Sequence, residues 1–240
     1  MLIQVYELSI FLAMINFVKQ KLKKFLPTYY FQFSKSYSQD GEDMILKALF
    51  EQKKGYKGFF VDVGAHHPVR FSNTKYFYNK GWKGINIEPT PDAIKAFELF
   101  RKRDINLNIG IGPEKGKLTF HCFNEPALNS FSKEVSERID RESDKYKIIR
   151  RLDIDVLPLS EVFDKYLPKG QQIDFISIDV EGFDYQVLLS NDWNKYQPEV
   201  ILVEENVDVD EISKSPIYQF LKDKGYKFFA KTLRTCIYRK

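Results

Sequence analysis

Residues 59–65 have the sequence FFVDVGA, an apolar run that ends in Asp-x-Gly. A short apolar run of this kind, followed by a glycine turn, is typical of a strand buried on both faces of a parallel sheet. Residues 173–182, IDFISIDVEG, show the same pattern and end in acidic residues. We interpret both runs as central strands whose carboxyl ends carry polar side chains.

Strands and helices alternate on both sides of these two runs. Further strands are predicted at 82–89, 105–111 and 198–206, and helices at 38–53, 71–81, 91–103, 159–167, 183–192 and 215–225. Segments 226–230 and 235–239 are expected to form a closing hairpin. The alternation predicts an α/β fold with a Rossmann-like, doubly wound, mostly parallel sheet and a C-terminal antiparallel β-hairpin.

One long connection interrupts the alternation. Residues 117–123 are expected to pair with 149–159, and the polar segment 124–148 between them contains a helical stretch. Loops of this length are usually lids or binding loops. We therefore divide the chain into a leader, 1–35, and a catalytic domain, 36–240, in which 124–148 is an insertion on the substrate side.

Composition limits the class of protein. The 240 residues are 43% hydrophobic and 29% charged, as in an ordinary soluble globular protein. The 2 cysteines exclude a disulfide scaffold and a Cys-rich zinc module. The net charge is only +4, and most of it lies in the first 40 residues, so no broad nucleic-acid surface and no nucleic-acid partner are expected.

The leader combines an apolar stretch at 8–18 with the basic run KQKLKK at 19–24. The stretch is too short to span a bilayer, and it lacks the flanks of a secretory signal. Either it forms a helix that packs on the domain or on a partner chain, or residues 8–24 contact anionic lipid at a membrane surface. We expect a cytoplasmic protein, at the inner face of the membrane in the second case, and leave its oligomeric state open.

The strand ends indicate a nucleoside ligand, because doubly wound sheets bind ligands beyond the carboxyl ends of their strands. Gly64 allows close approach of the backbone, and Glu88 lies where a carboxylate accepts hydrogen bonds from a ribose diol. The G-x-G-x-x-G turn of dinucleotide enzymes is missing. An adenosine ligand without a pyrophosphate therefore fits better than NAD.

Five segments together resemble the FkbM family of S-adenosylmethionine-dependent methyltransferases. They are SQDGED at 38–43, FFVDVGAHHPVRFSNT at 59–74, GWKGINIEP at 81–89, NEPALNSFSKE at 124–134 and IDFISIDVEGFDYQVL at 173–188. The resemblance covers roughly residues 36–206 and implies a class I methyltransferase fold. It also implies O-methylation, often of a sugar hydroxyl in a glycan or natural product, so the expected partner is a small-molecule or glycan acceptor.

The resemblance implies the cofactor S-adenosylmethionine and some of the residues around it. Asp62, Gly64 and Ala65 would hold its methionine end, and Glu88 its ribose. Ser38, Gln39 and Glu42 match the opening motif and are expected near the cofactor, although Ser38 also suits a helix N-cap. Asn108 and Asp179, at the ends of the third and fourth strands, complete the predicted set.

Methyl transfer to oxygen needs a group that takes the hydroxyl proton. His66 follows the cofactor turn directly, and Asp179 and Glu181 end the fourth strand, so these three are the catalytic candidates. Either histidine of the His66–His67 pair could instead only hydrogen-bond the loop, and one of the two carboxylates could cap the helix at 183–192. His121 is predicted to be structural.

A metal-dependent version is also compatible with the sequence. Asp179, Glu205 and Asn206 resemble the Asp and Asp-Asn ligands that hold Mg²⁺ in catechol O-methyltransferase-like enzymes, with Glu in place of one Asp. Neighbouring strand residues face opposite ways, so Glu204 is the alternative to Glu205. Base catalysis without a metal is the competing hypothesis.

Two other functional classes remain at this point. One is an NAD-linked sugar oxidoreductase, which would need the missing glycine-rich turn. The other is a non-catalytic, membrane-attached interaction module, which the leader favours and the polar strand ends disfavour.

Overall fold

The computed structural model describes residues 33–52 and 55–240, and the chain divides into two units, Met1–Lys35 and Ser36–Lys240. The helices and strands described below all belong to the second unit. The predicted leader helix and the predicted lipid contact through 8–24 lie outside the described residues. Among the described helices, none has the length and apolarity needed to cross a membrane.

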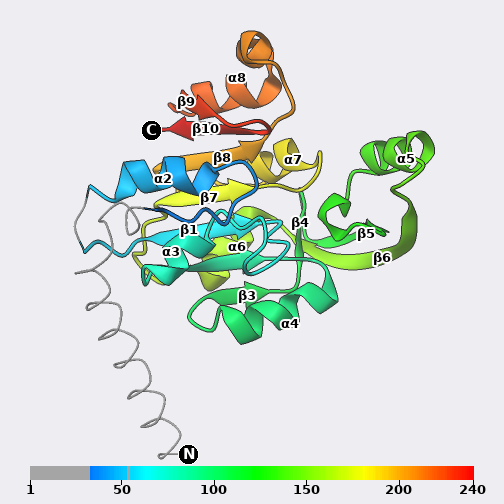
Figure 1. The fold of residues 1–240 in the computed structure, drawn as a ribbon, viewed down its shortest axis with the longest axis horizontal. Coiled ribbons are helices and arrows are strands. Elements are labelled where there is room, and N and C mark those ends of the chain that lie inside the picture. The colour runs from blue at the N-terminus through cyan, green and yellow to red at the C-terminus, as the bar shows by residue number, and fades with distance from the viewer. Residues whose placement is uncertain (1–32, 53–54) are drawn as a thin grey trace, which may run out of the picture. The chain divides into compact units, whose positions relative to one another are not determined.

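The second unit contains a seven-stranded sheet and a separate three-stranded sheet (Figure 1). The helices are α2 (Glu42–Phe50), α3 (Lys75–Asn79), α4 (Pro91–Phe100), α5 (Lys133–Glu142), α6 (Leu159–Tyr166), α7 (Asp184–Leu189) and α8 (Pro216–Asp223), with 3₁₀ turns η2 (Pro126–Leu128) and η3 (Val209–Lys214). The strands are β1 (Phe59–Val63), β2 (Lys83–Ile87), β3 (Ile105–Leu107), β4 (Gly110–Ile111), β5 (Gly116–Phe123), β6 (Ile148–Leu157), β7 (Phe175–Ile178), β8 (Val200–Glu204), β9 (Lys227–Lys231) and β10 (Thr235–Arg239).

The large sheet has the strand order β3-β2-β1-β7-β8-β10-β9. Strands β3, β2, β1, β7 and β8 are parallel to one another, and β10 runs antiparallel to both β8 and β9. The order reverses between β1 and β7, which is the switch point where such sheets bind ligands. The predicted doubly wound sheet with a C-terminal antiparallel hairpin is confirmed, and this is the class I methyltransferase fold.

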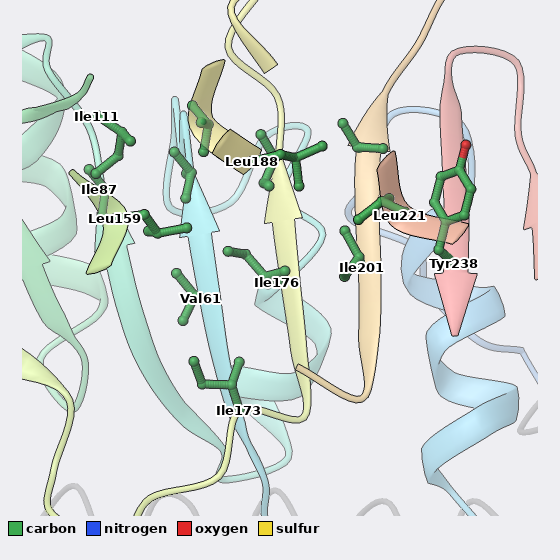
Figure 2. Packing of buried hydrophobic residues seen from close by; sticks show 14 of the residues in the cluster. Val61, Ile87, Ile111, Leu159, Ile173, Ile176, Leu188, Ile201, Leu221 and Tyr238 are labelled. Carbon is green, nitrogen blue, oxygen red and sulfur yellow. The ribbon is translucent and has the colours of Figure 1, made fainter. Parts of the chain in front are cut away.

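Both faces of the sheet are buried, which explains the continuous apolar runs of the central strands. On one face Val61, Ile176 and Ile201 lie side by side on β1, β7 and β8, against Leu188 of α7 and Leu221 of α8 (Figure 2). All five are at most 2% exposed. Burial of each such side chain stabilises the fold by about 1.5–3 kcal/mol.

The other face is aromatic and is covered by α2 and α3. The Phe77 ring of α3 lies 4.8 Å from Trp82 and 5.0 Å from Phe175 of β7, centroid to centroid. Phe50 of α2 contacts the same two rings edge-on or tilted. Packing on both faces of the sheet fixes the positions of the carboxyl ends of β1 and β7. It therefore also fixes the turns that follow these two strands.

The sequence prediction of one strand over 105–111 is wrong in one respect. The chain leaves the large sheet after Leu107, and Gly110–Ile111 joins the three-stranded sheet, which has the order β4-β6-β5. A Cβ at Gly110 would lie 2.4 Å from the Phe131 ring, so the crossing is open only to glycine. The predicted pairing of 117–123 with 149–159 is observed as the antiparallel pair β5–β6.

Candidate active site

A cavity lies at the switch point, beyond the ends of β1, β2 and β7. It encloses about 850 Å³ of empty space, including the part that opens to solvent. Its lining combines acidic residues of the strand ends with aromatic and amide side chains, and no lysine or arginine of the described residues belongs to it. The cavity therefore suits a ligand that carries positive charge.

The turn after β1 forms the floor of the cavity. The backbone N–H groups of Gly64 and Ala65 both donate to the carbonyl oxygen of Ile87, at 3.0 and 3.1 Å. Gly64 has φ +77°, and a Cβ there would lie 1.9 Å from the carbonyl oxygen of Asp179. The sequence suggested that Gly64 leaves room for a ligand. The structure adds that Gly64 leaves room for the neighbouring β7 turn.

Glu88 stands at the end of β2 and faces the cavity. Its two carboxylate oxygens accept the backbone N–H groups of His66 and Thr90, both at 2.7 Å. The residue is only 5% exposed, and burial raises the pKa of its carboxyl. Two backbone donors thus hold the carboxylate in place and leave its remaining lone pairs free for a ligand diol.

A buried network supports Asp62. Its Oδ2 accepts the Thr74 hydroxyl at 2.8 Å, and the same hydroxyl oxygen accepts from Arg101 at 2.5 Å. Arg101 also pairs with Asp104 at 2.9 Å and is completely buried. Burial raises the pKa of Asp62 to about 6, even though Thr74 and Arg101 lower it.

No local sequence pattern indicates this network around Asp62. From the sequence, Arg101 is one of several basic residues at the end of a helix, where it suits the helix dipole. No sequence pattern distinguishes it from its exposed neighbours Lys102 and Arg103. Only the packing of α4 beside the start of α3 shows that Arg101 is internal.

Three carboxylates meet at the ends of β7 and β8. One oxygen each of Asp179, Glu181 and Glu204 lies within 4.8 Å of the others. Burial and mutual repulsion raise the pKa of Glu181 and of Glu204 to about 8. Asp179 is more exposed, and desolvation within the cavity together with the neighbouring Glu204 raises its pKa well above its usual range. Arg234 is the cation that lowers the pKa of both glutamates.

The β7 turn itself is held by Asp184. Its carboxylate accepts the backbone N–H groups of Val180 and Gly182, at 3.2 and 3.0 Å. Neither Asp179 nor Glu181 caps α7, whose N-cap is Phe183 without a side-chain cap hydrogen bond, and Asp184 stabilises the turn before the helix instead. Glu181 is left with φ +54°, an unusual backbone conformation for a residue other than glycine. Such strain is common where a side chain is held for function.

The predicted Mg²⁺ ligand set of Asp179, Glu205 and Asn206 is not assembled. The Glu205 carboxylate lies on the opposite side of the sheet, where it accepts from Ser215 and, at 3.2 Å, from the Tyr238 hydroxyl. Asn206 is exposed. Glu204 is the residue that faces Asp179, because successive residues of a strand point to opposite faces.

Of three further residues predicted to hold the cofactor, Gln39, Glu42 and Asn108, only the first lines the main cavity. Glu42 is buried beside it and accepts from Thr232, so it lines an adjoining space and not the main cavity. Asn108 donates to the carbonyl oxygens of Glu88 and Pro89 at 2.8 and 3.0 Å, outside the cavity lining. Ile109 takes the lining position, because the chain turns out of the large sheet there.

The opening motif has a structural centre that the sequence analysis did not identify. Asp43 is completely buried, and its carboxylate accepts from the hydroxyls of Ser36 and Ser38, at 2.6 and 2.8 Å, and from the backbone N–H of Tyr37. Gly41, with φ +92°, is the N-cap of α2 in place of Ser38 or Asp40. The motif therefore fixes the segment that carries Gln39 to the cavity.

The histidines have separate environments. His66 lines the cavity with φ +51°, and its ring stacks on Phe71. Burial and the nearby Arg70 lower its pKa, which favours the neutral ring, and Arg70 Nη1 lies 3.3 Å from its Nε2. His67 Nδ1 accepts the backbone N–H groups of Val69 and Arg70, which gives this second histidine the loop-bonding role.

The 124–148 segment closes one side of the cavity. Pro126, Ala127, Asn129 and Phe131 line it. Ser130 anchors this wall to the β7 turn, because its hydroxyl lies 2.8 Å from the Glu181 carbonyl oxygen, to which it donates. Of this segment, the part before α5 forms the cavity wall, and that a substrate binds there stays a prediction.

The carboxylate pKa values predict how stability depends on pH. Asp184 has its pKa raised to about 7 and Glu181 and Glu204 to about 8, so the fold favours their protonated forms. Stability from these groups is complete at low pH and is lost as pH rises through their folded pKa values. The lowered pKa values of His66 and His67 act in the opposite sense, but below pH 6.5.

We therefore expect the free energy of unfolding of the ligand-free protein to fall between pH 6.5 and 8. Urea unfolding at a series of pH values measures it. The double variant Glu181→Gln/Glu204→Gln should have a flatter profile over the same range. A rise in stability with pH in the unmodified protein would contradict the arrangement.

The fold and the site together define a class of protein: a Rossmann-like fold with an acidic cavity at the switch point and a short glycine turn. Residues 62–228 match the family described as Methyltransferase FkbM domain, and the chain belongs to this family. The resemblance seen in the sequence is confirmed. Residues 62–228 are therefore a methyltransferase domain of this family, which implies S-adenosylmethionine as the cofactor.

Two solved structures illustrate the structural similarity. The METTL16 MTase domain is 11% identical with a TM-score of 0.43, over 82% of this chain and 65% of that one, so the chain spans less than two thirds of its length. The precorrin-6y C5,15-methyltransferase of Geobacter metallireducens GS-15 is 13% identical with a TM-score of 0.40, over 82% and 87% of the two chains. No curated protein matches the sequence.

Proposed function

We propose that the protein transfers the methyl group of S-adenosylmethionine to a hydroxyl oxygen of a sugar, a glycan or a hydroxylated natural product. The observation that carries the proposal is the position of the His66 imidazole in the same cavity as the carboxylates of the β1, β2 and β7 ends. The carboxylates suit a positively charged cofactor, and the imidazole suits the removal of a hydroxyl proton.

The residues present fit this cofactor. Glu88 would accept hydrogen bonds from the ribose diol, and Asp62 with the Gly64–Ala65 turn would hold the methionine end. Asn73 Oδ1 is buried without a hydrogen-bond partner among the described residues, and Asn73 lines the cavity. An unpaired acceptor of this kind is costly unless a ligand donor reaches it. Placing positive charge near Asp179 would relieve the repulsion that raises its pKa.

When bound, S-adenosylmethionine supplies a methyl group that is bonded to a positively charged sulfur. After the transfer, the rest of the cofactor leaves as a neutral thioether. The attacking hydroxyl must lose a proton as its oxygen bonds to carbon. His66 would take that proton on Nε2, its acceptor nitrogen, once the Arg70 guanidinium that lies 3.3 Å from this atom gives way to the acceptor hydroxyl. Asp179 and Glu181 would orient the acceptor hydroxyl at the β7 end. The amide side chains of Gln39 and Asn129, which line the cavity, favour a hydroxylated acceptor over an apolar one.

Calorimetry with the full chain tests the cofactor. S-adenosylmethionine should bind and NAD should not, because the β1 turn lacks the donors that a pyrophosphate needs. Transfer of an isotope-labelled methyl group to a panel of sugars, glycans and other hydroxylated compounds then tests the reaction. Binding of NAD alone, or of neither ligand, would favour the oxidoreductase or the non-catalytic module instead.

His66→Asn is expected to slow methyl transfer by about 10²–10⁴-fold, the usual contribution of a general base. Asparagine tolerates positive φ, so the turn should keep its shape. Affinity for S-adenosylmethionine should change by less than about threefold, because the Glu88 contact uses the backbone of residue 66. In the unmodified enzyme, kcat/KM should rise with pH through a pKa below 6.5.

His67→Asn is the matched control, since the loop-bonding histidine does not line the cavity. It should retain most of the activity. Equal rates for the His66 and His67 variants would show that His66 is not the base.

A further inference from the structure

A second cavity, here called the outer cavity, lies against the three-stranded sheet and the start of α5, the part that extends from the large sheet in Figure 1. It shares the rings of Phe131 and Phe183 with the main cavity, and the two ring centroids are 6.2 Å apart. The two cavities therefore adjoin across this pair of rings. Three basic side chains, His121, Lys133 and Arg151, also line the outer cavity.

The secondary structure brings these basic residues together. His121 on β5 and Arg151 on β6 are direct partners in the antiparallel ladder. Direct partners project from the same face of a sheet. Lys133 is the first residue of α5, where the partial positive charge of the helix N-terminus adds to its own.

The charge of the lining changes sign between the two cavities. Among residues 33–52 and 55–240, the main cavity is lined by carboxylates and by no lysine or arginine, whereas the outer cavity has Lys133, Arg151 and His121 and one carboxylate, that of Glu137. Lys133 lies 3.9 Å from Glu137 and Arg151 is exposed, so neither cation is neutralised by a close, buried partner. Asp153, the next acidic residue on this face of β6, is bonded to Thr119 instead.

His121 makes the outer cavity more than a group of surface cations. It is 4% exposed, and its Nδ1 is buried without a hydrogen-bond partner among residues 33–52 and 55–240. Its backbone is fixed on both sides by hydrogen bonds to Ser130, at 2.9 and 3.2 Å. The backbone thus holds the His121 ring at a basic cavity wall, and its Nδ1 is unused by the part of the chain that the structure describes.

We propose that the outer cavity binds an anionic group of the methyl acceptor, a carboxylate or a phosphate, so that the acceptor is an acidic hydroxylated molecule. The inference rests on the proposed function, because the acceptor would reach from the outer cavity past Phe131 and Phe183 to the strand ends. Arg151 and Lys133 bind the oxyanion, and the His121 ring responds to it. The basic residues lie in the outer cavity and not in the main one, which orients an acidic acceptor with its anion outward.

Imidazole NMR tests the anion site without any turnover. The chain has only 3 histidines, so the ring signals are few and His121→Asn assigns the one of interest. Burial, Arg151 and Lys133 lower the pKa of His121, while Glu137 and the Ser130 backbone raise it. A bound anion should raise it further. Titrating the full chain with inorganic phosphate and, separately, with glucuronate should move the His121 signals in a saturable way, and glucose should not.

Charge-removing variants locate the site. Arg151→Gln and Lys133→Gln should each weaken binding of the responding anion by about tenfold, the effect of losing a charge-assisted hydrogen bond. Lys117→Gln is the matched control, because Lys117 is an exposed lysine of the same strand β5 that pairs with Asp155 outside the cavity. The Lys117→Gln variant should bind the responding anion with the affinity of the unmodified protein.

The outcomes separate this inference from the proposed function. A response to phosphate only, or to glucuronate only, identifies which oxyanion the acceptor carries and supports the site. No saturable response to either anion, or equal losses in Lys117→Gln and Arg151→Gln, would overturn it. Efficient methylation of neutral sugars with a KM unchanged by Arg151→Gln would also overturn it while leaving O-methyl transfer intact. Failure to bind S-adenosylmethionine would refute the proposed function alone.

Discussion

Gly64→Ala is expected to destabilise the fold by about 2–5 kcal/mol. A left-handed backbone conformation destabilises a residue that has a Cβ by about 1–2 kcal/mol. Overpacking of the added carbon lowers the stability further, by about 1–3 kcal/mol. Both apply here, because Gly64 has φ +77° and its added Cβ would lie 1.9 Å from the backbone carbonyl of Asp179. That oxygen belongs to the residue directly after β7, the strand that pairs with β1. It can move only if the ends of β1 and β7 separate.

Urea unfolding measures this loss, and Gly116→Ala is the control. Gly116 lies at the start of β5, and nothing lies within 4 Å of a Cβ added there. The control should be as stable as the unmodified protein, or more stable by a few tenths to about 1 kcal/mol. Equal unfolding midpoints for the two variants would contradict the close approach of the two strand ends.

Glu88→Ala is expected to weaken binding of S-adenosylmethionine by about 10- to 100-fold. Hydrogen bonds to a charged group contribute about 1.5–3 kcal/mol, and a factor of ten corresponds to about 1.4 kcal/mol. The substitution also leaves the backbone N–H groups of His66 and Thr90 without their acceptor. The turn that carries His66 would therefore loosen together with the loss of the ribose contact.

Glu88→Gln separates these two effects, because an amide oxygen still accepts one backbone N–H and can accept from one ribose hydroxyl. Its affinity should lie between those of the unmodified protein and the alanine variant. Glu98→Ala, which removes an exposed carboxylate on nearby α4, should bind normally. If calorimetry gives Glu88→Ala the affinity of the unmodified protein, Glu88 does not hold the cofactor.

Much of the architecture was predictable because its signals are local. Apolar runs such as 59–63 and 175–178 indicate strands buried on both faces, and helices between them require a parallel sheet. The carboxyl ends of parallel strands share one edge, so Asp62, Glu88 and Asp179 were expected near one another before their contacts were known. The hairpin at the C-terminus followed from two short apolar segments across a turn.

Side-chain direction at the ends of strands was not predictable. In the run VEEN after β8, Glu204 and Glu205 are chemically alike, and only the register of β8 against β7 and β10 determines which one faces Asp179. The same limit applies to Arg101, whose burial depends on α4 packing beside α3, and to Asp184, whose carboxylate reaches back over its own turn.

By itself, then, the sequence determined the order of strands and helices, the switch-point location of the site and the family, because periodicity and short motifs are properties of neighbouring residues. The tertiary structure alone decided which carboxylates form the cluster at the β7 end and that Gly64 is required by the β7 backbone. It also decided that a basic cavity adjoins an acidic one across Phe131 and Phe183. These are contacts between segments far apart in the chain, and their geometry depends on strand register and helix packing, which no local pattern encodes.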